Sequence, residues 1–272
     1  MNKLKKILLI GSASYLGHNI IEKLESYYDI TSLNRDDIND FNLLKKKIKG
    51  TVFDILINTI VQYEVKDIST LIESNFYLGF KIYDTINKSE NFKLIQFGSF
   101  YSKSIKISQL DSYLLSKESL MNYSKLLNFH QKTNIFYLQL EHLIGPDESI
   151  KKFNGWLKHN LLNDVDITLG SCNHYFDFIY IDDVINLVDL LINTTRFKNE
   201  FKFFEVGSGK ATVLKSFVLD LKQTLNSKSQ ITFLGKGHLN GYKNRSSVAN
   251  IDELVDFGWL PKYEINDIIN SL

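Results

Sequence analysis

Tyr113 and Lys117 are the residues whose types and spacing carry the clearest chemistry in this sequence. They lie four positions apart in the stretch 111–123, DSYLLSKESLMNY, which we expect to be helical, so the lysine ammonium can lie beside the tyrosine phenol. A phenol has an ordinary pKa of about 10, and a neighbouring positive charge favours its ionised form. The pair can therefore move a proton near neutral pH, which is the proton chemistry of carbonyl reduction.

Sequence context separates this pair from a chance spacing. Tyr77 and Lys81 repeat the same interval, and either pair alone can be a surface helix with a stray aromatic residue. Ser99, however, precedes Tyr113 by fourteen positions and follows the apolar run 92–97, which indicates a buried strand. Tyr77 has no such hydroxyl before it. We therefore take Ser99, Tyr113 and Lys117 as the candidate catalytic residues.

A strand, a glycine-bounded turn and a helix open the chain in the order of a dinucleotide-binding unit. The apolar strand 5–10 leads into the segment 11–17, GSASYLG, and a helix is expected over 19–27. The two glycines permit a tight turn and a close approach of helix to strand, while backbone N–H groups at the helix start can face a pyrophosphate. A serine replaces the usual middle glycine, and a turn before an ordinary helix is the alternative interpretation. The candidate cofactor residues here are Gly11, Ser14, Tyr15, Leu16 and Gly17.

The second expected strand, 29–33, ends at Asn34 and Arg35. An acidic residue at this point would bind the ribose of NAD, whereas a guanidinium can pair with the 2′-phosphate of NADPH. The sequence therefore favours NADPH over NADH, with a solvated arginine as the alternative. The remaining candidate cofactor residues are Asp37, Ile38, Asn58, Thr59, Ile60, Asn75 and Lys117.

Strands and helices alternate through the first half of the chain, which predicts an α/β fold with a doubly wound parallel sheet. The elements expected after Arg35 are a polar turn at 37–40 that can hold an adenine, helix 41–48, strand 53–58, helix 68–88 and strand 92–97.

The composition bounds the class of protein. Lys plus Arg total 32 against 31 for Asp plus Glu, a net charge of +1, which argues against nucleic acid or an anionic membrane as partner. The single cysteine, Cys172, excludes an internal disulfide, and neither it nor the histidine spacing predicts a metal site. The N-terminal apolar run is too short for a signal peptide, and no stretch is long enough to span a membrane. We expect a cytoplasmic protein.

Five blocks of the sequence resemble the extended short-chain dehydrogenase/reductases that act on nucleotide-linked sugars. These are GSASYLG at 11–17, Asn58-Thr59-Ile60, Gly98-Ser99, Tyr113-Leu-Leu-Ser-Lys117 and Gly145-Pro146. The resemblance implies a Rossmann domain over 1–145 and, intertwined with it, a smaller sugar-nucleotide lobe over 146–272. It implies that Tyr113 is the general acid/base, that Lys117 lowers its pKa and holds the nicotinamide ribose, and that Ser99 binds the substrate carbonyl.

The second half is similar to CDP-abequose and CDP-paratose synthases, which reduce a C4 ketone on a CDP-linked dideoxy sugar for surface polysaccharides. The similarity lies in LQLEHLIGPDESIKKFNGWL and HYFDFIYIDDVINLV. It implies a homodimer formed through the helix that carries Tyr113 and the preceding one. The substrate contacts that it implies are Ser99, Phe100, Tyr101, His142, Asn154 and Arg245, the last on the nucleotide diphosphate.

Three departures from the family limit the resemblance. The loop between Ser99 and Tyr113 is shorter than in most relatives, and Gln139 and His142 replace a common arginine and asparagine. His142 is either a sugar contact or a structural histidine. Phe100 and Tyr101 replace the acidic pair of the sugar dehydratases, so the groups for water elimination are missing.

A 4-epimerase or 4-dehydrogenase with NAD is the enzymatic alternative to a reductase. A non-catalytic protein that senses the cofactor is the third interpretation.

Overall fold

The computed structural model of the protein describes residues 4–63, 67–100, 112–235 and 246–272. The chain divides into two units. The first holds Met1–Gln139 and Ile185–Phe204, and the second holds Leu140–Val184 and Glu205–Leu272. The chain therefore leaves the first unit, returns to it once and ends in the second.

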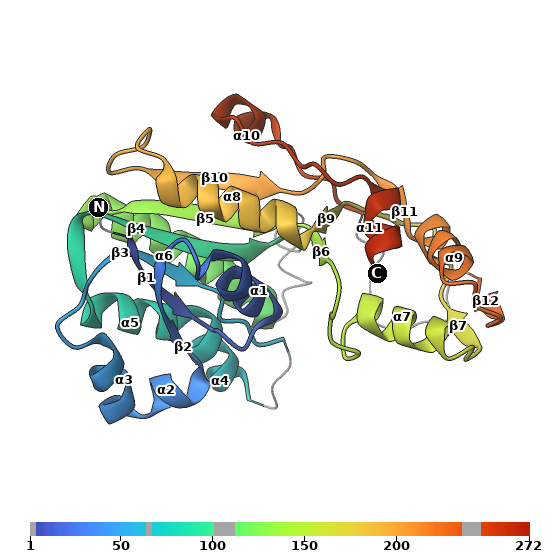
Figure 1. Cartoon of the computed structure of the whole chain (residues 1–272), viewed down its shortest axis with the longest axis horizontal. Helices are drawn as coiled ribbons and strands as arrows, with labels where there is room; N and C mark the ends of the chain where they lie inside the picture. The colour runs from blue at the N-terminus through green and yellow to red at the C-terminus, as the bar shows by residue number, and fades with distance from the viewer. Residues whose placement is uncertain (1–3, 64–66, 101–111, 236–245) are drawn as a thin grey trace. The chain divides into compact units, whose positions relative to one another are not determined.

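A six-stranded parallel sheet forms the centre of the first unit (Figure 1). In sheet order its strands are β10 (Phe201–Val206), β5 (Asn134–Leu140), β4 (Asn87–Ser99), β3 (Val52–Asn58), β1 (Lys6–Ile10) and β2 (Asp29–Leu33). β1 pairs with β2 on one side and with β3 on the other, so the direction of winding reverses at β1. Sheets of this kind bind ligands at the carboxyl ends of the strands beside such a reversal.

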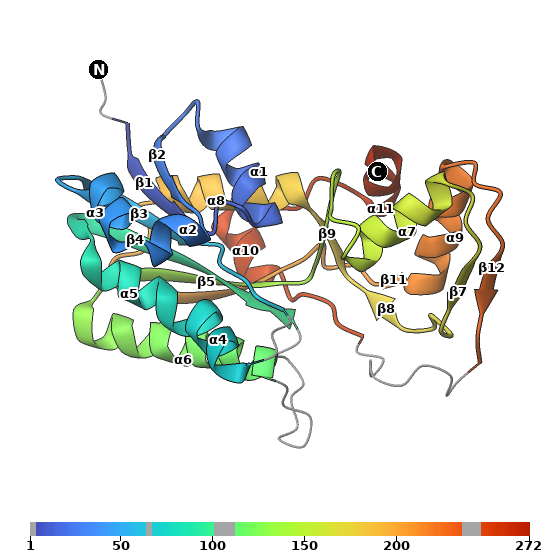
Figure 2. The same ribbon diagram turned by 90° about the horizontal axis from the view of Figure 1, so that it is seen from below.

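Helices cover both faces of the sheet (Figures 1 and 2). One face carries α1 (Tyr15–Leu24) and the part of α8 (Ile181–Asn193) that belongs to the first unit; the other carries α3 (Phe41–Ile48), α5 (Leu78–Thr85) and α6 (Ser112–Gln131). The shorter helices of this unit are α2 (Arg35–Asn39), α4 (Ile68–Ile72) and the π-helical segment η1 (Glu73–Tyr77). This doubly wound sheet confirms the predicted fold class.

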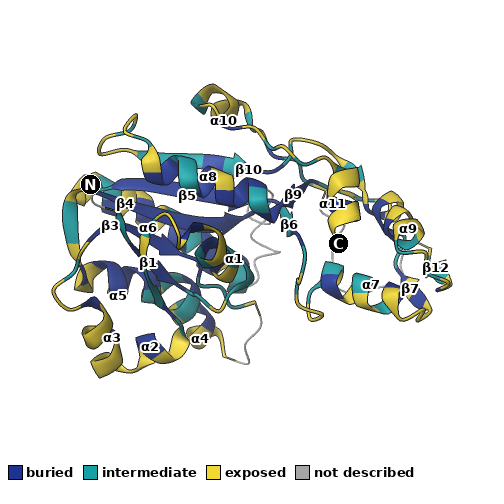
Figure 3. Cartoon of the chain, viewed as in Figure 1, coloured by how far each residue is buried: buried dark blue, intermediate teal, exposed yellow. Residues whose placement is uncertain are grey.

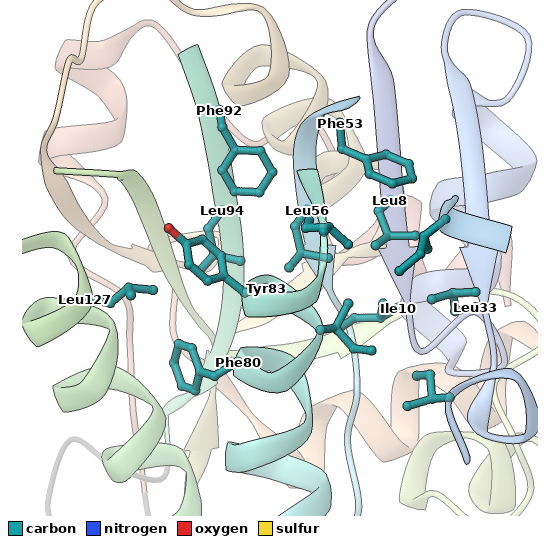
Figure 4. Close-up of a cluster of buried hydrophobic side chains, with 14 of the residues drawn as sticks. Leu8, Ile10, Leu33, Phe53, Leu56, Phe80, Tyr83, Phe92, Leu94 and Leu127 are labelled. Atoms are coloured by element: carbon teal, nitrogen blue, oxygen red, sulfur yellow. The ribbon is translucent and has the colours of Figure 1, made fainter. Parts of the chain in front are cut away.

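Side chains point alternately to the two faces of the sheet along each strand, and this alternation determines which residues form the core on each face. Leu8 and Ile10 point from β1 into a cluster with side chains of α5 and α6, among them Phe80 and Leu127 (Figure 4). Ile7 and Leu9, which are also fully buried, must point to the opposite face. β1 and most of β3 are accordingly buried on both sides, whereas the edge strand β2 is only partly buried and α2 and α3 expose much of their surface (Figure 3). Burial on both faces explains why β1 and β3 read as apolar runs.

Several element boundaries differ from those predicted, for local reasons. Helix α1 begins at Tyr15 and not at residue 19, because the Ser14 hydroxyl caps it by accepting the N–H of Gly17 at 3.0 Å. It ends at Leu24 rather than residue 27. The expected polar turn 37–40 lies mostly in helix α2, and the helix expected over 68–88 stops at Thr85. Strand β4 starts at Asn87, because its polar first residues still pair with β3 across a register shift.

The second unit is built on three pairs of short strands. β6 (His142–Ile144) pairs in parallel with β9 (Phe178–Tyr180), β7 (Ile167–Leu169) in parallel with β12 (Ile231–Phe233), and β8 (Tyr175–Phe176) antiparallel with β11 (Thr212–Val213). Its helices are α7 (Phe153–Leu162), α9 (Leu214–Thr224), α10 (Asp252–Phe257) and α11 (Ile265–Ser271). Across the described residues of both units, every helix is too short or too polar to pass through a lipid bilayer.

A buried carboxylate ties distant segments of the second unit together. Asp177 is fully buried, and its Oδ1 accepts hydrogen bonds from the backbone N–H and the hydroxyl of Ser208, each at 2.6 Å. Its Oδ2 accepts the N–H groups of Gly209 and Ala249, each at 3.0 Å. One side chain thus holds the loop after β10 and the segment near Ala249 in fixed positions.

Candidate active site

The glycine turn packs directly on the end of β3. Gly11 has a φ of +87°, a conformation that glycine adopts readily, and a Cβ there would lie 2.7 Å from the backbone nitrogen of Ile60. The Thr59 hydroxyl oxygen lies 3.0 Å from the carbonyl oxygens of both Ile10 and Gly11. It also accepts the hydroxyl of Ser14 at 3.0 Å. Ser14 therefore does more than replace the usual glycine, since it caps α1 and links the turn to β3.

The start of α1 fits the pyrophosphate of a dinucleotide. A Cβ at Gly17 would lie 2.4 Å from the carbonyl oxygen of Gly11, so only glycine lets the helix come this close to the strand. The first turn consists of Tyr15, Leu16 and Gly17, whose side chains are uncharged. The partial positive charge at the N-terminus of the helix is therefore available to an anion at the carboxyl edge of the sheet.

We expect Gly17→Ala to disrupt this turn. The added methyl group would meet the Gly11 carbonyl oxygen at 2.4 Å and the Thr59 hydroxyl at 2.6 Å, and the backbone oxygen cannot move without opening the turn. Titration of NADPH fluorescence should show binding weakened at least about tenfold, which corresponds to about 1.4 kcal/mol. Gly235→Ala is the matched control, because nothing lies within 4 Å of its added Cβ. Equal binding by both variants would contradict the expectation.

The residues after β2 serve mainly to start α2. Asn34 caps this helix, since its side chain accepts the N–H of Asp37 at 3.0 Å while its own N–H donates to the Asp37 carboxylate at 2.9 Å. Ile38 is buried in the hydrophobic cluster. Arg35 is exposed at the first position of α2, and its Nη2 donates to Gln62 Oε1 at 2.6 Å. The contacts of all four with a cofactor stay predictions.

Asp37 should contribute stability in a pH-dependent way. Burial alone would raise its pKa, but the hydrogen bond and charge of Lys47, 2.8 Å away, and the N–H of Asn34 lower it below its ordinary 3.8. A lowered carboxyl pKa means stability that is present above pH 4 and is lost as the pH falls through the folded-state pKa. We expect Asp37→Ala to cost about 1 kcal/mol at pH 7 in urea unfolding. The difference from the unmodified protein should shrink below pH 4, and a difference that stays constant as the pH falls would contradict the expectation.

The ends of β3 and β4 are joined through a buried amide pair. Asn58 Nδ2 donates to Gln96 Oε1 at 2.7 Å, and Asn58 Oδ1 accepts the N–H of Ile60 at 3.1 Å. Gly79 of α5 lies against the same amide, because a Cβ there would lie 2.4 Å from Asn58 Nδ2. The predicted block Asn58-Thr59-Ile60 is therefore held rigidly beneath the carboxyl edge of the sheet.

Asn75 connects that edge to α6. It lies in the π-helical segment η1, is almost fully buried, and accepts the N–H of Gln62 at 2.7 Å. Its Nδ2 donates to the Gln62 carbonyl at 2.8 Å and to the Ser116 hydroxyl at 3.1 Å. Ser116 in turn donates to the carbonyl of Tyr113 at 2.7 Å. π-Helical turns occur often at functional sites, and this one places Asn75 between the end of β3 and the first turn of α6.

Lys117 is buried in α6 and reaches to β4. Its Nζ donates to the carbonyl oxygen of Phe97 at 3.1 Å, two residues before Ser99. Burial lowers the pKa of Lys117 from 10.5 to about 8. The amine is thus mostly protonated at neutral pH but loses its proton far more readily than an exposed lysine. The lysine of the predicted pair is fixed against the strand that ends in Ser99.

Tyr113 lies half-buried in the first turn of α6, and its ring stacks on Tyr63 with centroids 5.4 Å apart. Tyr63 follows the end of β3, so this contact places Tyr113 at the carboxyl edge of the sheet. Ser99, the last residue of β4, is buried at the same edge, and buried Phe100 follows it. The structure thus brings Ser99, Tyr113 and Lys117 to the edge that carries the glycine turn.

The predicted substrate contacts beyond Phe100 fall in two groups. Tyr101 and Arg245 lie outside the described residues. His142 is in β6 of the second unit, where burial lowers its pKa to about 3 and its ring stacks on Phe176 at a centroid distance of 3.5 Å. Asn154, in the first turn of α7, hydrogen bonds to the side chain of Glu148. Their roles as sugar or nucleotide contacts stay predictions.

The sequence interpretation missed several residues that organise the site. These are Gln62, Tyr63, Gln96 and Ser116, which hold Asn75, Tyr113, Asn58 and the start of α6 in place. Ser116 stands beside Lys117 in the sequence, so its place on the helix face of Tyr113 was accessible from spacing. The glutamines gave no signal, since their partners come from other strands and helices.

Comparison with known proteins gives a consistent picture. Residues 7–207 match the NAD dependent epimerase/dehydratase family. CDP-abequose synthase of Salmonella muenchen is 26% identical over an alignment of 285 positions, and the alignment covers 98% of this chain and 97% of that protein. The structure of UDP-glucose 4-epimerase from Thermotoga maritima with UDP-glucose aligns with a TM-score of 0.82 and 16% identity, covering 98% and 96% of the two chains. RMD from Pseudomonas aeruginosa with NADPH aligns with a TM-score of 0.80 and 13% identity, covering 98% and 97%.

The family match extends over well more than half of the 272 residues, and it includes the glycine turn, Ser99 and the Tyr113-Lys117 pair. The solved structures, at such low identity, show the fold alone. Because sequence match, sheet topology and turn agree, the chain belongs to the NAD-dependent epimerase/dehydratase family and is an NAD(P)-dependent enzyme.

Proposed function

We propose that the protein reduces the C4 ketone of a nucleotide-linked 4-keto-deoxy sugar, as a step in the biosynthesis of surface polysaccharide sugars. The observation that carries the proposal is the placement of Lys117. Lys117 lies one helical turn after Tyr113, and its buried amine contacts β4, the strand that ends in Ser99. This contact lies at the edge of the sheet that also carries the glycine turn. A proton donor, an amine and a hydroxyl at one cofactor-binding edge are the groups that carbonyl reduction needs.

The proposed roles follow from the chemistry of each group. A bound nicotinamide supplies the hydride. Tyr113 gives its phenolic proton to the substrate oxygen, so that ketone, hydride and proton together yield the alcohol. The ammonium of Lys117 stabilises the phenolate that Tyr113 becomes, and the Ser99 hydroxyl donates a hydrogen bond to the substrate oxygen. Holding these groups in place supplies much of the acceleration.

One feature favours reduction over dehydration, and a second supports a CDP-linked substrate. Phe100 is apolar and buried where the sugar dehydratases carry an acid, so the carboxyl group for water elimination is missing at this position. CDP-abequose synthase of Salmonella muenchen aligns along almost the whole chain. In this proposal His142, Asn154 and Arg245 contact the sugar nucleotide.

We infer that the cofactor is NADPH. Arg35 is the second residue after β2 and is exposed, and in folds of this type the residues after the second strand meet the adenosine ribose. Its guanidinium can pair with a 2′-phosphate. In the structure its Nη2 donates to the neutral side-chain amide of Gln62 at 2.6 Å.

A 4-epimerase is the second candidate, because UDP-glucose 4-epimerase of Thermotoga maritima shares the fold and an epimerase needs the same serine, tyrosine and lysine. An epimerase holds its NAD tightly and returns it unchanged. The cofactor that remains with the purified protein therefore separates the two functions.

The test is to incubate purified protein with NADPH or NADH and with 4-keto deoxy sugars linked to CDP, dTDP and GDP. We expect oxidation of NADPH in a one-to-one ratio with sugar alcohol, fastest with a CDP-linked sugar. Protein that oxidises neither cofactor with any of these sugars, or that carries bound NAD and interconverts 4-hydroxyl epimers, would overturn the proposed reduction.

We also infer that two copies of the chain associate through α6. One stripe of this helix exposes Leu115, Leu126 and Phe129 by 45%, 51% and 68%, although apolar side chains of this size favour burial. Leu126→Glu should convert a dimer in size-exclusion chromatography with light scattering into a monomer. Leu219→Glu on α9, where the leucine is 43% exposed, should leave the dimer unchanged. An unmodified protein that is monomeric would refute the inference.

A further inference from the structure

Tyr137 in β5 touches both sides of the proposed catalytic set. Its side chain is almost completely buried, and its hydroxyl donates to the backbone carbonyl of Lys117 at 2.9 Å. A helical carbonyl oxygen has two lone pairs, so it can accept this hydrogen bond in addition to one within α6. The same side chain therefore reaches from the sheet to the helix that carries the lysine.

The ring of Tyr137 also occupies the space that a side chain at residue 98 would need. A Cβ on Gly98 would lie 2.4 Å from Cε1, 2.6 Å from the hydroxyl oxygen and 2.7 Å from Cζ of Tyr137. Gly98 immediately precedes Ser99. The glycine and the tyrosine are thus complementary, and together they fix how closely the end of β4 approaches β5.

These contacts connect two segments that the chain itself joins only through residues 101–111. Phe97 accepts the Lys117 ammonium at 3.1 Å, Gly98 lies against the Tyr137 ring, and Ser99 follows. Tyr137 in turn holds the backbone of Lys117. Any movement of Tyr137 would therefore change the position of Ser99 relative to the helix that carries Tyr113 and Lys117.

The hydroxyl is well suited to a permanent contact. Burial raises the pKa of Tyr137 far above neutral, so the phenol stays a hydrogen-bond donor over the whole range in which an enzyme works. A phenylalanine could fill nearly the same core volume. The hydroxyl costs free energy to bury unless it is paired, and here it is paired with the helix that carries the proposed catalytic groups.

We propose that Tyr137 is a positioning residue that, with Gly98, sets the distance between Ser99 and the Tyr113-Lys117 pair. The expected effect on kcat rests on the proposed function, whereas the contacts of Tyr137 do not. If Tyr137 had a purely structural role, its substitution would lower stability and nothing else.

Tyr137→Phe removes the hydroxyl and keeps the ring. We expect kcat for reduction to fall about tenfold with KM nearly unchanged, because the misplaced groups act in the transition state and not in binding. The pH profile of kcat should shift as Lys117 moves relative to Tyr113. Tyr83→Phe is the matched control, since Tyr83 is an equally buried tyrosine of the same core with its hydroxyl 2.9 Å from Gln131 Oε1. It should lower stability without changing kcat or the pH profile.

A second pair of variants tests the steric half of the proposal. Gly98→Ala should lower both the melting temperature and kcat, because the new Cβ meets the tyrosine ring. In the background of Tyr137→Leu the same glycine change should cost much less stability, whereas kcat should remain low. Such non-additivity is the signature of two groups in direct contact.

A measurement without substrate separates this proposal from the proposed function. The pKa of Lys117 can be followed by NMR of ¹³C-labelled lysine, with the signal assigned through Lys117→Met. This pKa should move from about 8 toward 10.5 in Tyr137→Phe but not in Tyr83→Phe. If the unmodified protein reduces no 4-keto sugar, the proposed function is wrong, and the Lys117 titration still tests the positioning role of Tyr137. Unchanged kcat, pH profile and Lys117 titration in Tyr137→Phe would show that Tyr137 only fills the core, and would overturn the positioning role.

Discussion

Tyr113→Phe should lower kcat for sugar reduction by about 10²–10⁴-fold while NADPH binding stays within about twofold. The phenyl ring keeps the stacking on Tyr63 at 5.4 Å and the half-buried position at the start of α6. What it loses is the proton that the substrate oxygen must receive. The measurement is the rate of NADPH oxidation at saturating sugar, together with the dissociation constant of NADPH.

The chain supplies its own control for this prediction. Tyr77 and Lys81 have the same spacing, but Tyr77 is 54% exposed in η1. Tyr77→Phe should leave kcat and NADPH binding unchanged. If the two tyrosine variants lost activity equally, or if Tyr113→Phe kept full activity, the assignment of Tyr113 as proton donor would be wrong.

Asp177→Ala should lower the free energy of unfolding by about 3–5 kcal/mol, measured by urea denaturation at pH 7. The carboxylate accepts four hydrogen bonds, at 2.6 Å and 2.6 Å from Ser208 and at 3.0 Å from Gly209 and Ala249. Its removal leaves the buried N–H of Ala249 and the partly buried N–H groups of Ser208 and Gly209 without this acceptor, and it opens a cavity. A loss of this size is a large part of the total stability of most domains.

Another carboxylate of the second unit provides the matched control. Asp166 is exposed and accepts the N–H of Gln230 at 2.7 Å, so Asp166→Ala should cost less than about 1 kcal/mol. Asp177 also anchors the segment that follows Arg245, through Ala249. Binding of a nucleotide sugar should therefore weaken in Asp177→Ala at temperatures where the protein is still folded. A small and equal cost in both variants would contradict the assignment of Asp177 as the central anchor.

The parts of the fold that depend on local sequence were predictable. Strands β1, β2 and β3 were predicted to within a residue. β1 and β3 are buried on both faces over most of their length, and such a strand reads as an apolar run bounded by polar residues. The glycine turn was predictable because few residues other than glycine suit a φ of +87° or a helix this close to a strand. The four-residue spacing of Tyr113 and Lys117 puts both residues on one face of the segment if the segment is helical, and both lie in helix α6.

The parts that depend on contacts between distant segments were not predictable. The polar start of β4 is a strand only because β3 lies beside it, and α2 forms where a turn was expected because Asn34 and Asp37 cap it reciprocally. The burial of Lys117, and with it a pKa of about 8, comes from the packing of α6 on β4. No sequence pattern marks Gln96 or Tyr137, whose partners come from other elements.

The return of the chain to its first unit determines the order in which that unit can be completed during synthesis. β5 ends at Leu140, but its neighbour β10 begins only at Phe201, about sixty residues later. A nascent chain must therefore wait until more than two thirds of its length has been made before the unpaired edge of β5 is covered. An exposed strand edge is prone to intermolecular pairing, so fragments that stop before residue 201 should aggregate although they contain the glycine turn, Ser99, Tyr113 and Lys117.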